Sequence, residues 1–140
     1  MSKFSEDLKR IKELMLLSEQ MEQYKDKFSV EYPDTVLILV NVDKLMKRLK
    51  KDNPDFYVDP NTDLKYHKNK IVKAMEFFKK NVIEGETIEG YHPPFITFSD
   101  KKLGVVEGRH RLAAIYNLGF VDTYIEVLES QVERFKSFIG

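Results

Sequence analysis

The residues best suited to chemistry lie together within the segment 103–120. Gly108 ends a short β-like run, and Arg109, His110 and Arg111 follow it where helical periodicity begins. The first backbone N–H groups of a helix lack partners within the helix, and the helix dipole adds partial positive charge there. Arginine side chains contribute forked donors that match phosphate oxygens. This turn therefore predicts a phosphate-binding site, although the pattern alone also fits the charged first turn of an ordinary amphipathic helix.

The elements that must position this turn can be predicted from hydrophobic periodicity and turn residues. Strands are expected at 36–42, 94–98, 103–107 and 123–128, and helices at 44–51, 65–82 and 130–138, besides the helix after Gly108. The aliphatic run 36–42 predicts a strand buried on both faces at the sheet centre. Asp43 follows it and is expected to cap the next helix. The expected fold class is mixed α/β (α+β), with about four strands surrounded by helices.

The N-terminal residues 2–27 are predicted to form a helical extension of a single domain that spans residues 1–140. Phe4, Leu8, Ile11 and Met15 recur there at helical spacing. We expect this apolar stripe to complete the core of its own domain. The alternative is a surface for dimerisation or for a partner helix, so monomer and homodimer both stay open.

Composition narrows the classes of partner and compartment. The 23 basic and 23 acidic residues balance, so no global charge draws the molecule to nucleic acid or an anionic membrane. The absence of cysteine excludes disulfides, thiolate metal sites and thiol catalysis. No apolar run reaches membrane-spanning length and the N-terminus lacks the layout of a signal peptide, so a cytoplasmic location without membrane contact is expected.

Two further segments carry candidate ligands. The helix 65–82 is the most basic part of the chain, and a nucleic-acid backbone could be contacted by its exposed cations Lys70, Lys73, Lys79 and Lys80. The loop 52–64 is long for a compact domain, as functional loops often are. Its carboxylates Asp55, Asp59 and Asp63 could supply a magnesium ligand, although solvated turn residues are the more common role.

Two motifs resemble the conserved boxes of the ParB/sulfiredoxin superfamily. The run GRHRLAA at 108–114, followed by Leu118-Gly119, is similar to the phosphate-binding box in which a strand ends in a Gly-x-[His/Arg]-Arg turn that opens a helix. Upstream, GYHPPFI at 90–96 resembles the Gly-x-x-x-Pro box that precedes the neighbouring strand. The likeness covers about residues 36–128, and it implies the ParB/sulfiredoxin-like architecture for this core.

The resemblance implies a nucleoside triphosphate, ATP or CTP with Mg²⁺, whose phosphates rest on the box at 108–111. The nucleotide-binding residues that it implies are Gly108, Arg109, His110, Arg111, His92 and Pro94. Glu107 would act as catalytic base or magnesium ligand, with His110 as the second catalytic candidate. Because Arg111 stands at the position shared by both versions of the box, Arg111→Ala is expected to weaken binding more than Arg109→Ala.

Departures from the family pattern select among its activities. Sulfiredoxins need a reactive cysteine where this chain has Arg109, so that activity is excluded. Partition proteins place a glutamate there and continue into a helix-turn-helix domain, so a stand-alone relative is expected instead. The leading expectation is nucleoside-triphosphate binding that serves hydrolysis or phosphoryl transfer. The alternatives are a non-enzymatic nucleotide- or DNA-binding module of phage or plasmid DNA metabolism and a ParB-like nuclease.

Overall fold

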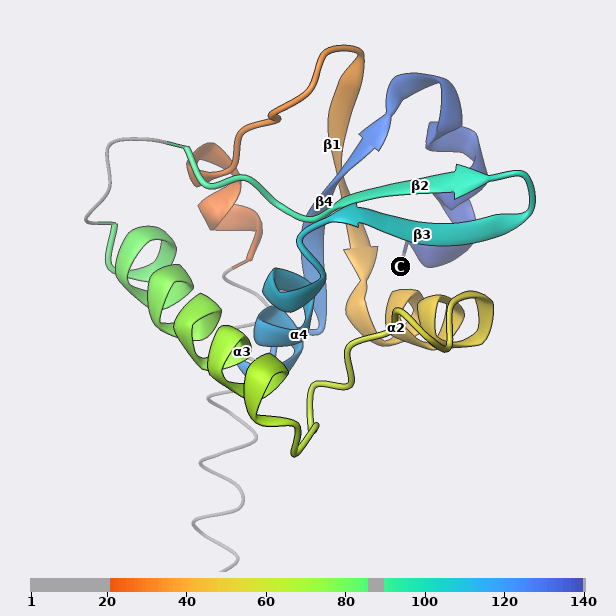
Figure 1. The fold of residues 1–140 in the computed structure, drawn as a ribbon. Helices are drawn as coiled ribbons and strands as arrows, with labels where there is room; N and C mark the ends of the chain where they lie inside the picture. The colour runs from red at the N-terminus through yellow and green to blue at the C-terminus, as the bar shows by residue number, and fades with distance from the viewer. Residues whose placement is uncertain (1–20, 86–89, 140) are drawn as a thin grey trace, which may run out of the picture.

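The computed structural model describes residues 21–85 and 90–139, and the mixed α/β class is confirmed (Figure 1). In chain order the described elements are η1 (Glu22–Lys27), β1 (Thr35–Asn41), α2 (Val42–Asp52), α3 (Lys65–Phe78), η2 (Lys79–Ile83), β2 (Phe95–Ser99), β3 (Lys102–Glu107), α4 (Arg109–Asn117), β4 (Asp122–Leu128) and η3 (Glu129–Phe138). The helix expected at 65–82 is present, with its last turn widened into the π-helix η2.

The four strands form one mixed sheet in the order β1-β4-β2-β3. β1 and β4 are antiparallel, β4 and β2 are parallel, and β2 and β3 form an antiparallel hairpin. The expectation that β1 lies at the sheet centre is wrong, because β1 is an edge strand and most of its residues are only half-buried. The most buried strand is β4, whose residues 123–127 are all buried, and its polar residues Thr123 and Glu126 make it look less central in the sequence than it is.

Glu126 is completely buried in β4, and its carboxylate is satisfied by one short segment of the chain. Glu126 Oε1 accepts from the N–H of Glu31 at 2.9 Å, and Oε2 accepts from the N–H of Tyr32 at 2.9 Å and from Thr35 Oγ1 at 2.8 Å. A buried carboxylate is tolerated only when hydrogen bonds replace its hydration. These bonds therefore fix the segment 31–35 against the sheet.

Helix α2 begins earlier than the sequence indicated, so the expected capping role of Asp43 is wrong. The side chain of Asn41 accepts from the N–H of Lys44 at 2.9 Å and caps the helix. Asp43 lies in the first turn and pairs with Lys47 at 3.0 Å. Asn41 is thus both the last residue of β1 and, through its side-chain amide, the cap of α2.

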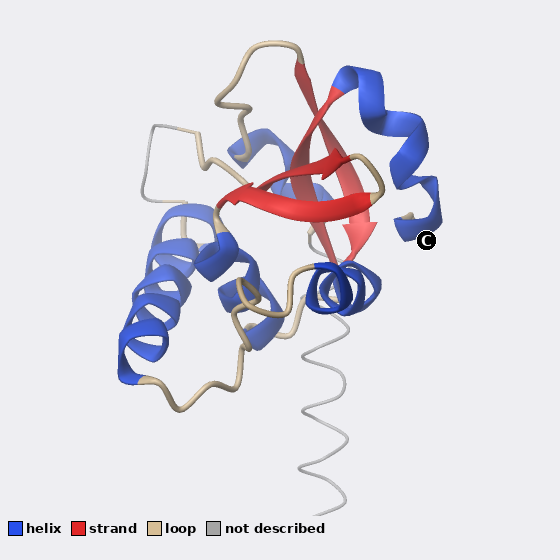
Figure 2. Ribbon diagram, turned by 45° about the vertical axis from the view of Figure 1, so that its right-hand side comes forward, coloured by secondary structure: helices blue, strands red, loops and turns tan. Residues whose placement is uncertain are grey.

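The far end of α2 holds the edge strand β3. Asp52 Oδ2 accepts from the N–H of Leu103 at 2.8 Å, and this bond is the main cause of the lowered pKa of Asp52. The next side chain, Asn53, donates through Nδ2 to the carbonyl of Leu103. The two contacts dock the end of α2 against β3, and Figure 2 shows this helix nearly end-on below the strand. α3 packs against α4 on the other side of the loop 53–64.

Gly108 lies at the junction between β3 and α4, with Arg109, His110 and Arg111 in the first turn of the helix, as predicted. Its φ of 95° is in the left-handed region. A Cβ added there would lie 2.9 Å from the Cα of Pro94. The two boxes seen in the sequence are therefore in direct contact, and only glycine fits the junction.

The N-terminal helix predicted at 2–27 falls mostly outside the described residues. Within them, η1 is a short 3-10 helix, and Met21 and Phe28 on either side of it are buried in the main apolar core. Among the residues that the structure describes, no helix is both long and apolar enough to cross a bilayer.

Gly108→Ala is expected to lower the free energy of unfolding by about 1–3 kcal/mol, the scale of backbone strain at such a position. The matched control is Gly104→Ala, because its Cβ would have 4.0 Å to the nearest atom and its backbone is not left-handed. Urea unfolding followed by circular dichroism measures both variants. Equal stability of the two would contradict the packing described for the junction.

Candidate functional site

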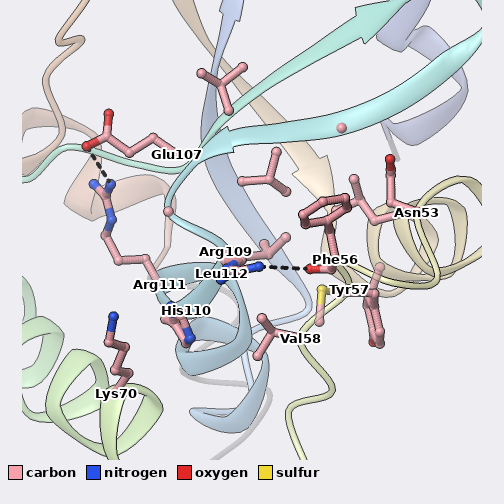
Figure 3. Close-up of a pocket in the computed structure, with 16 residues that line it drawn as sticks. Asn53, Phe56, Tyr57, Val58, Lys70, Glu107, Arg109, His110, Arg111 and Leu112 are labelled. Carbon is pink, nitrogen blue, oxygen red and sulfur yellow. Dashed lines mark hydrogen bonds and ion pairs between the residues drawn. The ribbon is translucent and has the colours of Figure 1, made fainter. Parts of the chain in front are cut away.

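A cavity of about 670 Å³ lies beside the first turn of α4 (Figure 3). Its walls come from α2, the following loop, α3, β3 and α4, through Met46, Leu49, Asn53, Phe56, Tyr57, Val58, Lys70, Gly104, Val105, Val106, Glu107, Gly108, Arg109, His110, Arg111 and Leu112. This volume is in the range of small-molecule and cofactor sites. The predicted phosphate turn thus forms one end of a cavity large enough for a whole ligand.

The first turn of α4, whose residues line this cavity, contains backbone donors that the helix itself does not bind. Gly108 is the N-cap residue of α4 and has no side chain that could bind the first turn. The first bond of the helical ladder runs from the N–H of Leu112 to the carbonyl of Gly108 at 2.9 Å. The N–H groups of Arg109, His110 and Arg111 precede that bond and have no partner within the helix. Such a turn favours an anion, because its donors and the helix dipole act together.

The two arginines of this turn point in different directions. Figure 3 shows Arg109 reaching across the cavity toward Phe56, whose carbonyl accepts from Nη1 at 3.5 Å. Arg111 folds back over Gly108, where Nη1 donates to the carbonyl of His92 and Nη2 lies 3.8 Å from Glu107 Oε1. A contact of 3.5 Å is weak. Arg109 therefore keeps its donors available to a ligand, whereas Arg111 is already engaged.

Glu107 is held on the side of the box away from Arg109. The hydroxyl of Tyr32 donates to Glu107 Oε2, and this bond raises the pKa of Tyr32 to about 12. The other oxygen faces Arg111. Because Glu126 binds the N–H of Tyr32, the buried carboxylate of β4 is connected through Tyr32 to the carboxylate beside the box.

The residues considered for magnesium do not fit that role. Glu107 already accepts a hydrogen bond from the Tyr32 hydroxyl and lies beside the Arg111 guanidinium, so a divalent cation would meet an occupied ligand and a like charge. Asp55, Asp59 and Asp63 are exposed and do not line the cavity. Across residues 21–85 and 90–139, no three side chains of His, Cys, Asp or Glu are grouped as a metal site built by the protein alone would require. Magnesium held mainly by nucleotide phosphates needs only one or two carboxylates, so its binding with a nucleotide stays a prediction.

His110 is paired with His67 of α3, which sequence reasoning did not assign to the site. His67 Nδ1 and His110 Nε2 are 2.8 Å apart, and the ring centroids are 5.1 Å apart with planes inclined by 28°. These values place both nitrogens on the line between the ring centres, so the rings meet edge to edge through one N–H···N bond. Burial, with the nearby charges of Arg109, His67 and Lys70, lowers the pKa of His110 to about 4.

One lysine of the basic helix belongs to the cavity. Lys70 lines it, with Nζ 4.5 Å from the ring centre of Tyr66, and a hydrogen bond to Lys70 lowers the pKa of that tyrosine. The other members of the proposed nucleic-acid set, Lys73, Lys79 and Lys80, are exposed and do not line it. The basic helix therefore contributes one cation to the same end of the cavity as Arg109.

The wall formed by the loop after α2 is apolar and partly open. Phe56 is 73% exposed although it lines the cavity. Tyr57 is half-buried next to it in the chain, and its burial raises its pKa. An exposed aromatic ring at a cavity mouth is a surface on which a flat heterocycle can stack.

His92 and Pro94 contact the box but do not line the cavity. The carbonyl of His92 binds Arg111, and its ring Nδ1 is 3.1 Å from the carbonyl of Ser29. The carbonyl of Pro94 accepts from the N–H of Glu126 at 2.9 Å. Their backbones position Gly108 and Arg111.

No protein-family model, curated protein sequence or solved structure matches this chain. The ParB/sulfiredoxin likeness therefore rests on the two motifs alone, and what it implies stays a prediction. Among the residues that the motifs did not indicate are Phe56 and Tyr57, which line the cavity, and His67, which contacts His110. The unusual length of the loop 52–64 was the sequence signal that pointed to Phe56 and Tyr57.

We expect His110 to be neutral at pH 7, because burial and neighbouring cations disfavour its charged form. In the unfolded chain it would titrate near its ordinary value of 6.5. Between that value and about 4 the unfolded chain binds a proton that the folded protein does not, so stability falls as pH falls through this window. Nitrogen-15 NMR of the imidazoles measures the titration directly, and His110→Asn should reduce the loss of melting temperature. Titration of His110 at pH 6.5 in the folded protein would contradict the assignment.

Proposed function

We propose that this protein binds a nucleoside triphosphate, or a nucleotide of similar size, in the cavity beside α4. The observation that carries the proposal is that one cavity is lined both by the glycine-capped first turn of α4 and by the exposed aromatic residue Phe56. A nucleotide has the same division into a charged phosphate chain and a flat apolar base. The motif resemblance supports the same ligand independently of the cavity.

The phosphate end of the proposed site combines backbone and side-chain donors. The N–H groups at the start of α4 would receive one phosphate, and Gly108 lets it approach closely. Arg109 and Lys70 come from different helices and supply charge on the cavity side. Because the lining residues include three cations and one carboxylate, the local charge is positive although the chain is neutral overall.

The base end would use the aromatic and aliphatic side chains at the cavity mouth. Phe56 offers an exposed ring, while Met46 and Leu49 of α2 form an apolar floor. Stacking on an aromatic side chain contributes about 1–3 kcal/mol for a base. The loop 53–64 thus acts as the nucleoside wall in this proposal.

Binding is supported more directly than catalysis. Phosphoryl transfer needs a general base within hydrogen-bond reach of the acceptor. The nearest carboxylate, Glu107, is engaged by Tyr32 and Arg111 and would have to release Arg111 before it could serve. Hydrolysis or transfer is therefore the second candidate, and release of phosphate from labelled ATP or CTP by wild type but not by Glu107→Gln would establish it.

Arg109→Ala is expected to weaken ATP or CTP binding by roughly ten- to a hundredfold, the effect of losing about 1.5–3 kcal/mol from a charge-assisted contact. This geometry reverses the ranking implied by the resemblance, because Arg111 is held by His92 and Glu107. Arg111→Ala should have the smaller effect on affinity but the larger effect on melting temperature. Titration calorimetry at fixed salt, with a thermal melt of each variant, measures both quantities.

The matched control is Lys73→Ala, which removes an exposed cation of α3 outside the cavity and should leave the affinity within about twofold. Wild-type protein that binds neither ATP, CTP nor inorganic tripolyphosphate would refute the proposal. Equal losses in Lys73→Ala and Arg109→Ala would instead favour the α3 surface and a nucleic-acid partner. A larger loss of affinity in Arg111→Ala would restore the ranking implied by the family motif.

A further inference from the structure

The outer edge of β3 forms part of the cavity wall. β3 is the last strand in the order β1-β4-β2-β3, so one side of its backbone has no neighbouring strand. At Leu103 this side is covered, because Asp52 accepts from its N–H and Asn53 donates to its carbonyl. The open edge is therefore confined to the residues between Leu103 and Gly108.

The register assigns one backbone donor–acceptor pair to that open edge. In an antiparallel ladder the N–H and C=O of a residue both face the partner strand or both face outward, and the two cases alternate along the strand. Leu103 faces outward, so Gly104 faces β2 and Val105 faces outward again. The partner strand agrees, because Phe98 opposite Leu103 bonds through both backbone groups to Gln131 on its own outer side, at 2.9 and 3.0 Å. The alternation does not continue to Glu107, because the register shifts between Phe95 and Ile96 and sets Glu107 opposite Phe95, which faces β3.

Val105 lines the cavity, and within the described part of the chain no hydrogen bond is found for its outward N–H or C=O. Backbone groups near a cavity usually have a partner, either water or a ligand. The apolar side chains that line the same cavity include Met46 and Leu49 on α2 and Phe56 on the loop, while the polar Asn53 is bound to the carbonyl of Leu103. A ligand group at this position would be bound by one donor and one acceptor beneath apolar side chains.

The surroundings of the open edge favour a small flat ligand over an added peptide strand. Strand addition needs successive outward residues, because its affinity comes from a row of main-chain bonds. Here Asp52 and Asn53 block the edge at Leu103, and the turn at Gly108 ends it on the other side. One donor beside one acceptor matches the edge of a nucleobase, where a ring nitrogen lies next to an exocyclic amino or carbonyl group.

We propose that the backbone N–H and C=O of Val105 bind the base of the nucleotide, so that tight binding requires a base as well as phosphates. This inference rests on the proposed function, since it places the base of the same ligand whose phosphates bind α4. Val105 is then the specificity-determining position, and the aromatic ring of Phe56 covers the base from one face. The contact uses the backbone and leaves no side-chain motif in the sequence.

Val105→Pro removes the outward N–H without removing a bond of the β2–β3 ladder, which is the situation in which an edge strand accepts proline. Val105→Ala keeps the N–H and controls for the lost side chain. Calorimetry with ATP, CTP and inorganic tripolyphosphate compares the two variants with wild type. We expect Val105→Pro to weaken the better nucleotide by about tenfold more than Val105→Ala does, while tripolyphosphate binding differs by less than about twofold between the two variants.

A measurement on the wild-type protein covers the case in which Val105→Pro does not fold. ATP methylated at N1 and CTP methylated at N3 have a blocked base edge, so at least one should bind about tenfold more weakly than its parent nucleotide. Unchanged affinity for both analogues, or nucleotides that bind no better than tripolyphosphate, would overturn the role of Val105 while leaving the phosphate site intact. Wild-type protein that also fails to bind tripolyphosphate would refute the proposed function itself.

Discussion

The buried carboxylate of Glu126 is the interaction on which the geometry around the box depends. A charge inside the central strand of a sheet is costly unless several donors surround it. Glu126 obtains them from the segment 31–35, and its own N–H binds the carbonyl of Pro94. One residue therefore connects β4 to the segment that carries Tyr32 and to the backbone that contacts Gly108. No other described side chain of Asp, Glu, Lys, Arg or His is buried to this degree.

A chain of contacts leads from Glu126 to the charged groups around the box. Tyr32 reaches Glu107, Glu107 faces Arg111, and Arg111 binds the backbone of His92. These contacts hold Arg111 against the box and leave Arg109 and Lys70 as the two cavity-lining cations that they do not engage. The same turn thus contains one arginine that stabilises the structure and one that can serve a ligand. Such a division cannot be read from the spacing Arg-x-Arg, because both side chains belong to a single helical turn.

Local features of this protein could be predicted and tertiary ones could not. The junction at Gly108 was predictable because glycine and the onset of helical periodicity are adjacent in the chain. The sheet order was not, since the aliphatic run of β1 resembles a central strand more closely than β4, which contains Glu126. The pairing of His67 with His110 and the cavity wall at Phe56 arise from packing between distant segments. Composition marked the loop 52–64 as unusual, but it could not indicate which side chains face α4.

The central claim is that nucleotide phosphates bind the backbone at the start of α4, and amide NMR with and without ATP or CTP tests it most directly. Titration should move the N–H resonances of Arg109, His110 and Arg111 together and with one affinity, because these groups precede the first bond of the helical ladder. Inorganic tripolyphosphate should move the same three resonances. Shifts confined to the exposed lysines of α3, with these three amides unchanged at saturation, would contradict the claim.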